Sequence, residues 1–390
     1  MIIELITKST NYNEMNVLLN FATIKKGGGQ NVAINFLETL RYNSFDEFNF
    51  TYVVVDGSEI HKLLLDLKVE RLLVMPFNPI KRILKEIIFG RTIIQKFKID
   101  LIYSYFGYGL YPKSVKQVTG SADSNIFFPE VDFWSEYSGV VKYFKHIIDL
   151  YRVWGLKRCT AVIFENEEMQ VRARNLYNIV NSVYIKPSIM IDCLHEPIDG
   201  LNKLNKEVYT GLFLCGWQKN KNYMIIPQLI KEFKKKNIKF HFILTADLDN
   251  SFEHQKFLQD IRLNNANENV SIIGNVPKRK IFDLYQKIDF VFLLSKLESF
   301  SNNIIESWYF NKVLVISDAN WARSICMNAA LYVDRDNPDK ITNVIAAYLS
   351  SDKQKEDLFK EIKKTLSLHP NVFTKTQQEL SYLKFIHEKN

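Results

Sequence analysis

The sequence predicts two α/β domains, each a Rossmann-like, doubly wound parallel sheet, that face each other across a cleft. Three observations lead to this prediction. The 390 residues are enough for two domains of ordinary size. Short apolar, β-branched runs alternate with segments of helical period, which is typical of βαβ units. Residues 184–207 break that alternation with Pro187, Pro197 and Gly200, as an interdomain connection does.

The break sets the expected domain limits. Residues 1–188 form an N-terminal domain and residues 189–372 a C-terminal domain, while residues 373–390 form a helix that packs back on the N-terminal domain. Residues 1–14 precede the first strand and are expected to be an extension. Strands are expected at 16–22, 50–56, 98–106, 159–166, 209–216, 238–246, 270–276, 289–295 and 312–317. Helices are expected at 30–42, 223–236, 253–265, 278–288 and 301–311.

Composition narrows the class of protein. Hydrophobic residues make up 47% and charged residues 24% of the chain, a balance typical of soluble globular proteins. No apolar run reaches 18 residues, and the start lacks the features of a secretory signal, so we expect a cytoplasmic protein. The four cysteines stand singly, which argues against a zinc site and a disulfide framework. We therefore expect no metal and no cofactor.

The net charge of +8 favours anionic partners. From residue 61 to 116 there are 11 Lys and Arg against 4 Asp and Glu, interleaved with apolar residues. Such a stretch can lie on an anionic membrane surface, or it can be an ordinary amphipathic helix whose basic residues face water. Nucleic acid is not an expected partner, because the chain carries no recognised nucleic-acid-binding motif.

A glycine run, Gly27 to Gly29, follows the first predicted strand and opens a helix. Gly28 and Gly29 are candidate ligand-binding residues, since glycines let a backbone approach a phosphate at a helix N-terminus. The dinucleotide fingerprint and the phosphate-loop pattern are both absent. The alternative interpretation is that the glycines serve only the geometry of the turn.

The C-terminal domain offers two further loops at strand ends. The first contains Gly216, Lys219 and Lys221, whose ammonium groups could reach a diphosphate beyond the sheet. The second holds Glu298 and leads into a helix that contains Glu306. Between these two glutamates the helix N-terminus offers free backbone amides to an anion. The candidate residues of this segment are Ser299, Phe300, Ser301, Asn302 and Asn303.

Residues 274–318 resemble the C-terminal signature of the family 4 retaining glycosyltransferases of GT-B fold. That signature has a glycine after a strand, a helix with spaced Pro, Leu, Tyr and Asp, two glutamates separated by seven residues, and a strand ending near Ser-Asp. The matching positions are Gly274, Pro277, Leu284, Tyr285, Asp289, Glu298, Glu306, Ser317 and Asp318. The likeness continues more loosely around the glycine run, in residues 161–174 and in residues 186–192.

The resemblance implies a role for each matching residue. Glu298 would contact the transferred sugar, Glu306 would hold the ribose hydroxyls, and Lys221 would grip the diphosphate. Two positions depart from the family. Trp217 stands where an Arg is usual, so Lys219 is the expected substitute. The N-domain His is replaced by a Ser121–Asp123 segment, in which Asp123 is a candidate catalytic residue near the acceptor.

The resemblance also implies an activity. It is the retaining, metal-independent transfer of a hexose from a UDP- or GDP-linked donor to a glycan or lipid-linked acceptor, in surface polysaccharide or lipopolysaccharide synthesis. The enzyme would act in the cytoplasm, peripherally on the inner face of the cell membrane. Three alternatives stay open. The first is a metal-dependent GT-A glycosyltransferase, whose paired metal-binding aspartates the Asp-Leu-Asp at 247–249 would match. The second is a sugar-nucleotide epimerase of GT-B architecture. The third is a non-catalytic module that binds a nucleotide sugar without transferring the sugar.

Overall fold

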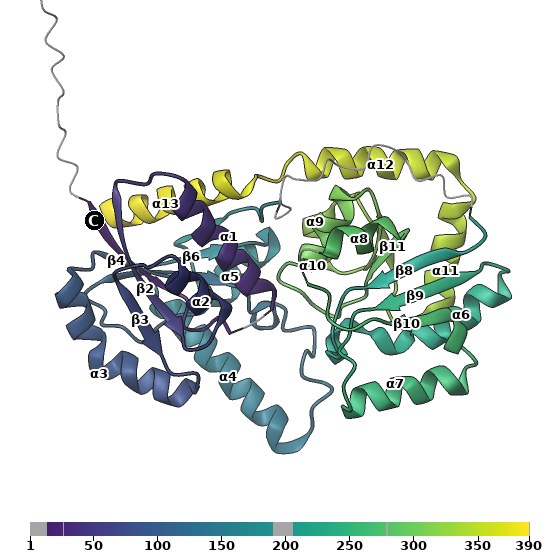
Figure 1. The fold of residues 1–390 in the computed structure, drawn as a ribbon, viewed down its shortest axis with the longest axis horizontal. Helices are drawn as coiled ribbons and strands as arrows, with labels where there is room; N and C mark the ends of the chain where they lie inside the picture. The colour runs from purple at the N-terminus through teal and green to yellow at the C-terminus, as the bar shows by residue number, and fades with distance from the viewer. Residues whose placement is uncertain (1–13, 26, 190–205, 278–279, 390) are drawn as a thin grey trace, which may run out of the picture.

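The computed structural model describes residues 14–25, 27–189, 206–277 and 280–389. These residues form two separate parallel sheets with helices on both faces, one in each half of the molecule (Figure 1). The predicted pair of doubly wound α/β domains is thereby confirmed. The expected N-terminal extension, apart from Glu14, and most of the expected interdomain connection lie outside the described residues.

The N-terminal sheet has seven strands in the order β3-β2-β1-β4-β5-β6-β7. Every neighbouring pair is parallel. The order reverses between β1 and β4, so the loops that leave these two strands diverge at the carboxyl edge of the sheet. The strands are β1 (Met15–Asn20), β2 (Phe48–Val55), β3 (Leu72–Met75), β4 (Leu101–Ser104), β5 (Lys116–Ser121), β6 (Ala161–Phe164) and β7 (Ser182–Tyr184).

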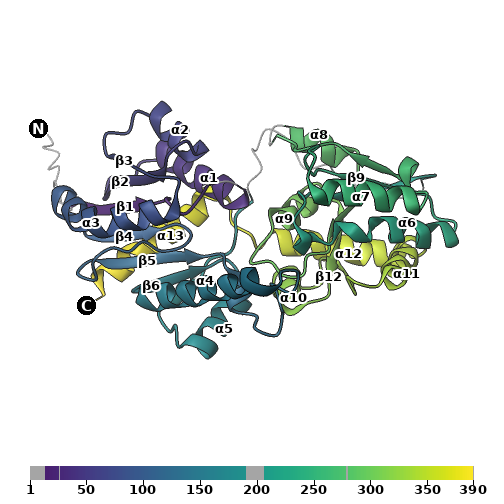
Figure 2. The ribbon, with the colours of Figure 1, turned by 90° about the horizontal axis from the view of Figure 1, so that it is seen from below.

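Two hydrophobic clusters line the two faces of this sheet. One packs the sheet against α1 (Gly28–Tyr42), α2 (Glu59–Asp66) and the C-terminal helix α13 (Val372–Glu388). The other packs it against α3 (Pro79–Phe97) through Ile93. Helix α4 (Gly139–Arg158) lies on the α3 side, as the view from below shows (Figure 2). Helix α5 (Glu167–Tyr177) joins β6 to β7.

The C-terminal sheet has six strands in the order β10-β9-β8-β11-β12-β13, which reverses between β8 and β11. Its strands are β8 (Tyr209–Phe213), β9 (Phe240–Leu244), β10 (Val270–Ile272), β11 (Phe290–Leu293), β12 (Val313–Ser317) and β13 (Leu331–Val333). Its helices are α6 (Ile226–Lys235), α7 (Phe252–Leu263), α8 (Ile281–Gln286), α9 (Asn302–Tyr309), α10 (Asn320–Cys326), α11 (Pro338–Leu349) and α12 (Asp352–Leu366). Short 3₁₀ turns lie at 124–126, 219–221, 223–225 and 267–269.

After α12 the chain crosses back to the N-terminal domain, where α13 packs against α1. A buried ionic group lies in this contact. The Lys375 ammonium lies 2.6 Å from Glu165 Oε1 and 3.3 Å from Glu379 Oε1. Burial raises the pKa of Glu379 to about 7, although the nearby lysine opposes that shift. The end of the chain is therefore tied to the end of β6 through charge as well as packing.

The resemblance implied β5, as the strand before the Ser121–Asp123 segment, but the sequence did not predict the short strands β3, β7 and β13. Each has only three or four residues and lies at or next to an edge of its sheet, so its apolar pattern is too short to stand out. The remaining predicted strands are present, with ends that differ by a few residues.

Candidate functional site

The candidate site lies at the carboxyl edge of the C-terminal sheet, between the loops that follow β8 and β11. These strands are neighbours at the reversal of strand order, which is where doubly wound sheets bind ligands. The β8 loop carries Gly216 and the 3₁₀ turn Lys219–Lys221. The β11 loop carries Glu298 and ends at Ser301, the N-cap of α9.

Asn220 holds the two loops together. Its side-chain amide donates to the carbonyl of Leu297 at 3.0 Å and accepts from the backbone amide of the same residue at 3.2 Å. The backbone carbonyl of Asn220 also accepts from the amide of Lys296 at 2.9 Å. These three hydrogen bonds fix the β8 loop against the residues that immediately precede Glu298.

Lys221 and Glu298 meet across that junction. The Lys221 Nζ lies 2.5 Å from Glu298 Oε1, and the two side chains are 21% and 14% exposed. An ion pair in this half-buried setting is screened less by water than a surface pair. The structure therefore brings together two candidate residues that are 77 positions apart in the sequence.

The first turn of α9 completes the C-terminal part of the site. Ser301 is buried and makes no side-chain capping bond, and Asn303 instead donates to the carbonyl of Leu214 at 3.0 Å. Glu306, one turn further on, accepts a hydrogen bond from the Tyr285 hydroxyl at 3.1 Å. Burial and the Glu306 carboxylate raise the pKa of Tyr285 well above its ordinary value, so this hydroxyl stays a donor.

The glycine run of the N-terminal domain faces this turn. Gly27 is the N-cap of α1 and has φ of 88°, a conformation that favours glycine. A methyl group on Gly28 would lie 3.9 Å from Nδ2 of Asn302. One on Gly29 would lie only 3.3 Å from the Phe106 ring. The loop after β1 thus reaches the N-terminus of α9, and two helix N-termini from different domains lie close together.

Asn166, which the sequence analysis did not single out, links the domains at the same place. It is fully buried at the N-cap of α5, and its Nδ2 donates to the carbonyl of Ser299 at 3.1 Å. Its Oδ1 accepts from the amide of Met169 and from the hydroxyl of Ser324. An asparagine is a common N-cap, so its residue type could suggest the start of a helix. It could not indicate a hydrogen-bond partner 133 residues away.

The predicted substitute for the missing arginine, Lys219, is an exposed residue of the 3₁₀ turn. Trp217 stacks on the His254 ring with centroids 5.0 Å apart and packs against Tyr223 and Phe257. Its indole nitrogen donates to the carbonyl of Asp247. Trp217 is therefore part of an aromatic cluster that supports the β8 loop.

In the N-terminal domain, Asp123 lies just beyond β5 and pairs with Arg152 of α4 at 3.3 Å. Burial raises the pKa of Asp123 despite this partner, and the nearby Asp149 adds to the shift. Ser121 is buried at the end of β5 and its hydroxyl has no hydrogen-bond partner within the described part of the chain. Both residues therefore lie at the carboxyl edge of the N-terminal sheet.

The Asp-Leu-Asp segment lies between β9 and α7. Oδ1 of Asp249 accepts hydrogen bonds from the amide and hydroxyl of Ser251, which caps α7. These bonds give the Asp249 carboxylate a local role in a turn. Across residues 14–25, 27–189, 206–277 and 280–389, no group of three or more His, Cys, Asp or Glu side chains has the arrangement of a metal site.

Residues 201–365 match the family model described as glycosyl transferases group 1. A comparison with curated proteins gave no match. Solved structures match nearly the whole chain. A glycosyltransferase from Rickettsia africae ESF-5 is 16% identical, with 97% of this chain and 100% of that chain covered and a TM-score of 0.70.

Two further structures agree. Anabaena Alr3699/HepE in complex with UDP-glucose is 17% identical, with 95% of this chain and 100% of that chain covered and a TM-score of 0.67. WaaG, a glycosyltransferase involved in lipopolysaccharide biosynthesis, is 8% identical, with 96% and 100% covered and a TM-score of 0.66. The fold of this chain is therefore that of the GT-B glycosyltransferases, as the resemblance implied.

Proposed function

We propose, from a GT-B fold in which residues 201–365 match glycosyl transferases group 1, that this chain is a retaining, metal-independent glycosyltransferase. It moves a hexose from a UDP- or GDP-linked donor to a glycan or lipid-linked acceptor in surface polysaccharide synthesis. The observation that carries this proposal is the contact between Lys221 and Glu298 beside the α9 N-terminus, opposite the glycine loop.

In this proposal the C-terminal domain binds the donor. Lys221 and the free amides of the α9 turn hold the diphosphate, because a cation and a helix N-terminus both favour negative charge. Glu306 accepts hydrogens from the ribose hydroxyls, and Glu298 accepts a hydrogen from the sugar. Tyr285 already orients the Glu306 carboxylate through its hydrogen bond.

The reaction needs no residue that forms a covalent intermediate. The acceptor hydroxyl attacks the anomeric carbon on the face from which the diphosphate leaves, the bond to the diphosphate breaks, and the hydroxyl proton passes to the departing phosphate oxygen. Charge on the leaving group must be stabilised, which is the task of Lys221 and the α9 amides. The loop that carries Gly28 and Gly29 closes over the donor and excludes water from the reacting sugar.

The acceptor side belongs to the N-terminal domain, where Asp123 is proposed to take a polar role. The basic stretch 61–116 is proposed to bring the enzyme to the anionic inner face of the cell membrane, where a lipid-linked acceptor would be found. Within the ranges that the structure describes, no helix is long and apolar enough to cross a membrane. Docking on the surface is therefore the mode of membrane contact that is proposed.

The test is incubation of the purified chain with labelled UDP- and GDP-sugars and a lipid extract, followed by separation of the products. Label transferred to lipid or glycan supports the proposal, and retention of the anomeric configuration is checked on that product. A labelled nucleotide sugar of changed configuration would identify an epimerase instead. Binding without turnover would identify a non-catalytic module, and activity lost on chelation and restored by a divalent cation would contradict metal independence.

A further inference from the structure

Helix α4 exposes an unusual number of large apolar side chains. Eight of them are 41–70% exposed, and together they are named the α4 apolar face. They are Val140, Val141, Tyr143, Phe144, Ile147, Ile148, Leu150 and Trp154. Soluble proteins seldom leave a contiguous apolar surface of this kind uncovered unless it binds something. This helix lies outside the basic stretch that the sequence analysis singled out.

Helix α3 has an exposed apolar stripe of its own. Leu84, Ile87 and Ile88 follow Ile80 by four, seven and eight positions, and the four side chains are 52–69% exposed. This spacing puts them on one side of the helix. Glu86, Gly90 and Ile93 are the residues of α3 that are buried against the domain. Since Ile93, Ile94 and Phe97 pack in the core cluster on that side, α3 has apolar side chains on both its inner and its outer side.

The two helices lie on the same face of the N-terminal sheet. The crossovers from β3 to β4 and from β5 to β6 run in the same direction along the sheet, so their right-handed connections place α3 and α4 on one side. Figure 2 shows both helices in front of the sheet, with α13 behind it. The two apolar surfaces thus belong to one side of the molecule.

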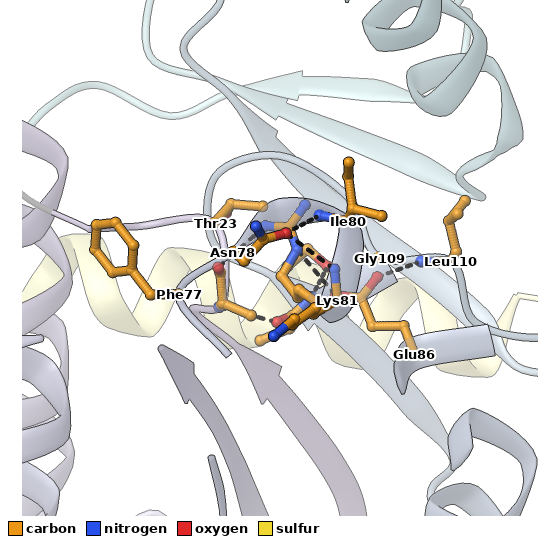
Figure 3. A network of polar contacts seen from close by, with 12 residues as sticks. Thr23, Phe77, Asn78, Ile80, Lys81, Glu86, Gly109 and Leu110 are labelled. Atoms are coloured by element: carbon orange, nitrogen blue, oxygen red, sulfur yellow. Dashed lines mark hydrogen bonds and ion pairs between the residues drawn. The ribbon is translucent and has the colours of Figure 1, made fainter. Parts of the chain in front are cut away.

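Basic residues outnumber acidic residues on both helices. Each has five Lys or Arg and a single acidic residue, a net charge of +4 per helix. The acidic residue of α3, Glu86, is 1% exposed and accepts a hydrogen bond from the amide of Leu110 (Figure 3). That of α4, Asp149, accepts from the Trp134 indole and pairs with Arg152. Both carboxylates are thus engaged within the domain.

Four of the basic residues are exposed, whereas Arg82, Lys85, Arg152 and Arg158 bond within the domain. The exposed residues are Lys81, Arg91 and Lys96 of α3 and Lys157 of α4. In the loop before α4, Asp132 pairs with Lys142, which offsets one cation of α4, and Glu130 pairs with Arg172 of α5. Apolar side chains flanked by Lys and Arg, with aromatic residues such as Tyr and Trp among them, suit the interface of an anionic bilayer.

The α4 apolar face also begins beside the candidate site. The Lys296 ammonium, two residues from Glu298, donates to the carbonyl of Asp132 at 2.5 Å and to the hydroxyl of Ser135 at 2.6 Å. The segment that makes these bonds leads directly into α4. A molecule held in a bilayer under α4 would therefore lie next to the loop that carries Glu298.

We propose that α3 and α4 together form a membrane-docking face, with α4 as the main inserting element and an anionic lipid bilayer as its partner. Charge complementarity favours a bilayer over a second copy of this basic chain, because two copies would bring cations of the same sign together. The proposal deepens the proposed function, since it places a lipid-linked acceptor at the donor loop. Docking on a bilayer does not require the transfer reaction. An experiment can therefore refute the docking proposal without refuting the proposed function, and the reverse.

The test is co-sedimentation of the full chain with vesicles of phosphatidylcholine alone or mixed with phosphatidylglycerol. We expect binding to the mixed vesicles that weakens as salt is added. The double variant Phe144→Asp and Ile148→Asp should bind at least about tenfold more weakly, since it replaces two apolar side chains of the inserting face by carboxylates. Leu263→Asp on α7 is the matched control, because Leu263 is 72% exposed in the C-terminal domain.

A second measurement follows the tryptophan fluorescence of the chain, which should shift to shorter wavelength on the mixed vesicles. The Trp154→Phe variant should lose that shift. Equal vesicle binding by the double variant and the Leu263→Asp control would overturn the proposal. The proposal would also be overturned if the unmodified chain formed a dimer without lipid and the double variant, but not the control, abolished that dimer. Transfer to a soluble acceptor should persist in the double variant, which separates loss of docking from loss of the proposed activity.

Discussion

Replacing Lys221 by Met should weaken the binding of a nucleoside diphosphate while leaving the binding of the nucleoside nearly unchanged. In the structure the Lys221 ammonium lies 2.5 Å from Glu298 and is 21% exposed, so it is held at the site by a strong contact. If it binds the diphosphate, the variant loses a charge-assisted hydrogen bond worth about 1.5–3 kcal/mol. That loss corresponds to a rise in Kd of about 10- to 150-fold.

The Glu298→Gln variant should behave differently, because Glu298 is the present partner of Lys221. The substitution removes a negative charge beside the diphosphate position and frees the ammonium. Nucleoside diphosphate affinity should therefore be maintained or increase. Turnover should fall, because the hydrogen bond to the reacting sugar is weakened.

Calorimetric titration with UDP and GDP, each compared with its nucleoside, measures both effects. Lys256→Met serves as the control, since Lys256 is an exposed lysine of α7, in a helix away from the β8 and β11 loops. The reasoning is wrong if Lys221→Met binds UDP and GDP as well as the control does. It is equally wrong if the variant loses the nucleoside and the nucleoside diphosphate to the same extent, because that pattern indicates a damaged site.

Three further predictions concern Glu306, Lys375 and Glu379. Glu306→Ala should weaken binding of the nucleoside as well as of the nucleotide, and unchanged affinity in calorimetry would refute the ribose role. Lys375→Met should cost about 3–5 kcal/mol of unfolding free energy in urea titrations, because it leaves Glu165 and Glu379 buried together without their cation. Since burial raises the pKa of Glu379 to about 7, above the value of 4.5 expected when unfolded, the folded state holds a proton that the unfolded state releases between these pH values. Stability should therefore fall as pH rises from 4.5 to 7, and Glu379→Gln should flatten that slope; an unchanged slope would contradict the assignment.

The sequence was sufficient to predict the fold and the proximity of Lys221 and Glu298, because both depend on local signals. Buried parallel strands appear as continuous apolar runs, and residues directly after such runs must lie at one edge of the sheet. Lys221 and Glu298 each follow a predicted strand, so their proximity could be expected before the structure. The opening of α1 at the glycine run followed from the same type of signal.

Contacts between distant polar residues could not be predicted in this way. The bond from Asn166 to Ser299 depends on how the two domains pack, and the bonds from Asn220 to Leu297 depend on the exact path of two loops. Asparagine is common in turns and caps for local reasons, so its type does not identify a remote partner. The exposed side of α4 was missed for a related reason. Its apolar residues occur almost all round the helix, and only the structure separates the buried ones from the exposed ones.

Because Trp217 stands where the family has an arginine, the candidate site lacks that positive charge. As a member of an aromatic cluster with His254 and Tyr223, it supports the β8 loop but brings no positive charge. In the proposed function Lys221 is the cation that binds the diphosphate, and in the structure it is paired with Glu298. If the proposed diphosphate draws the ammonium away from that carboxylate, Glu298 becomes available to a sugar hydroxyl in the same step. In the proposed mechanism, binding of the diphosphate and recognition of the sugar are thus coupled through a single ion pair.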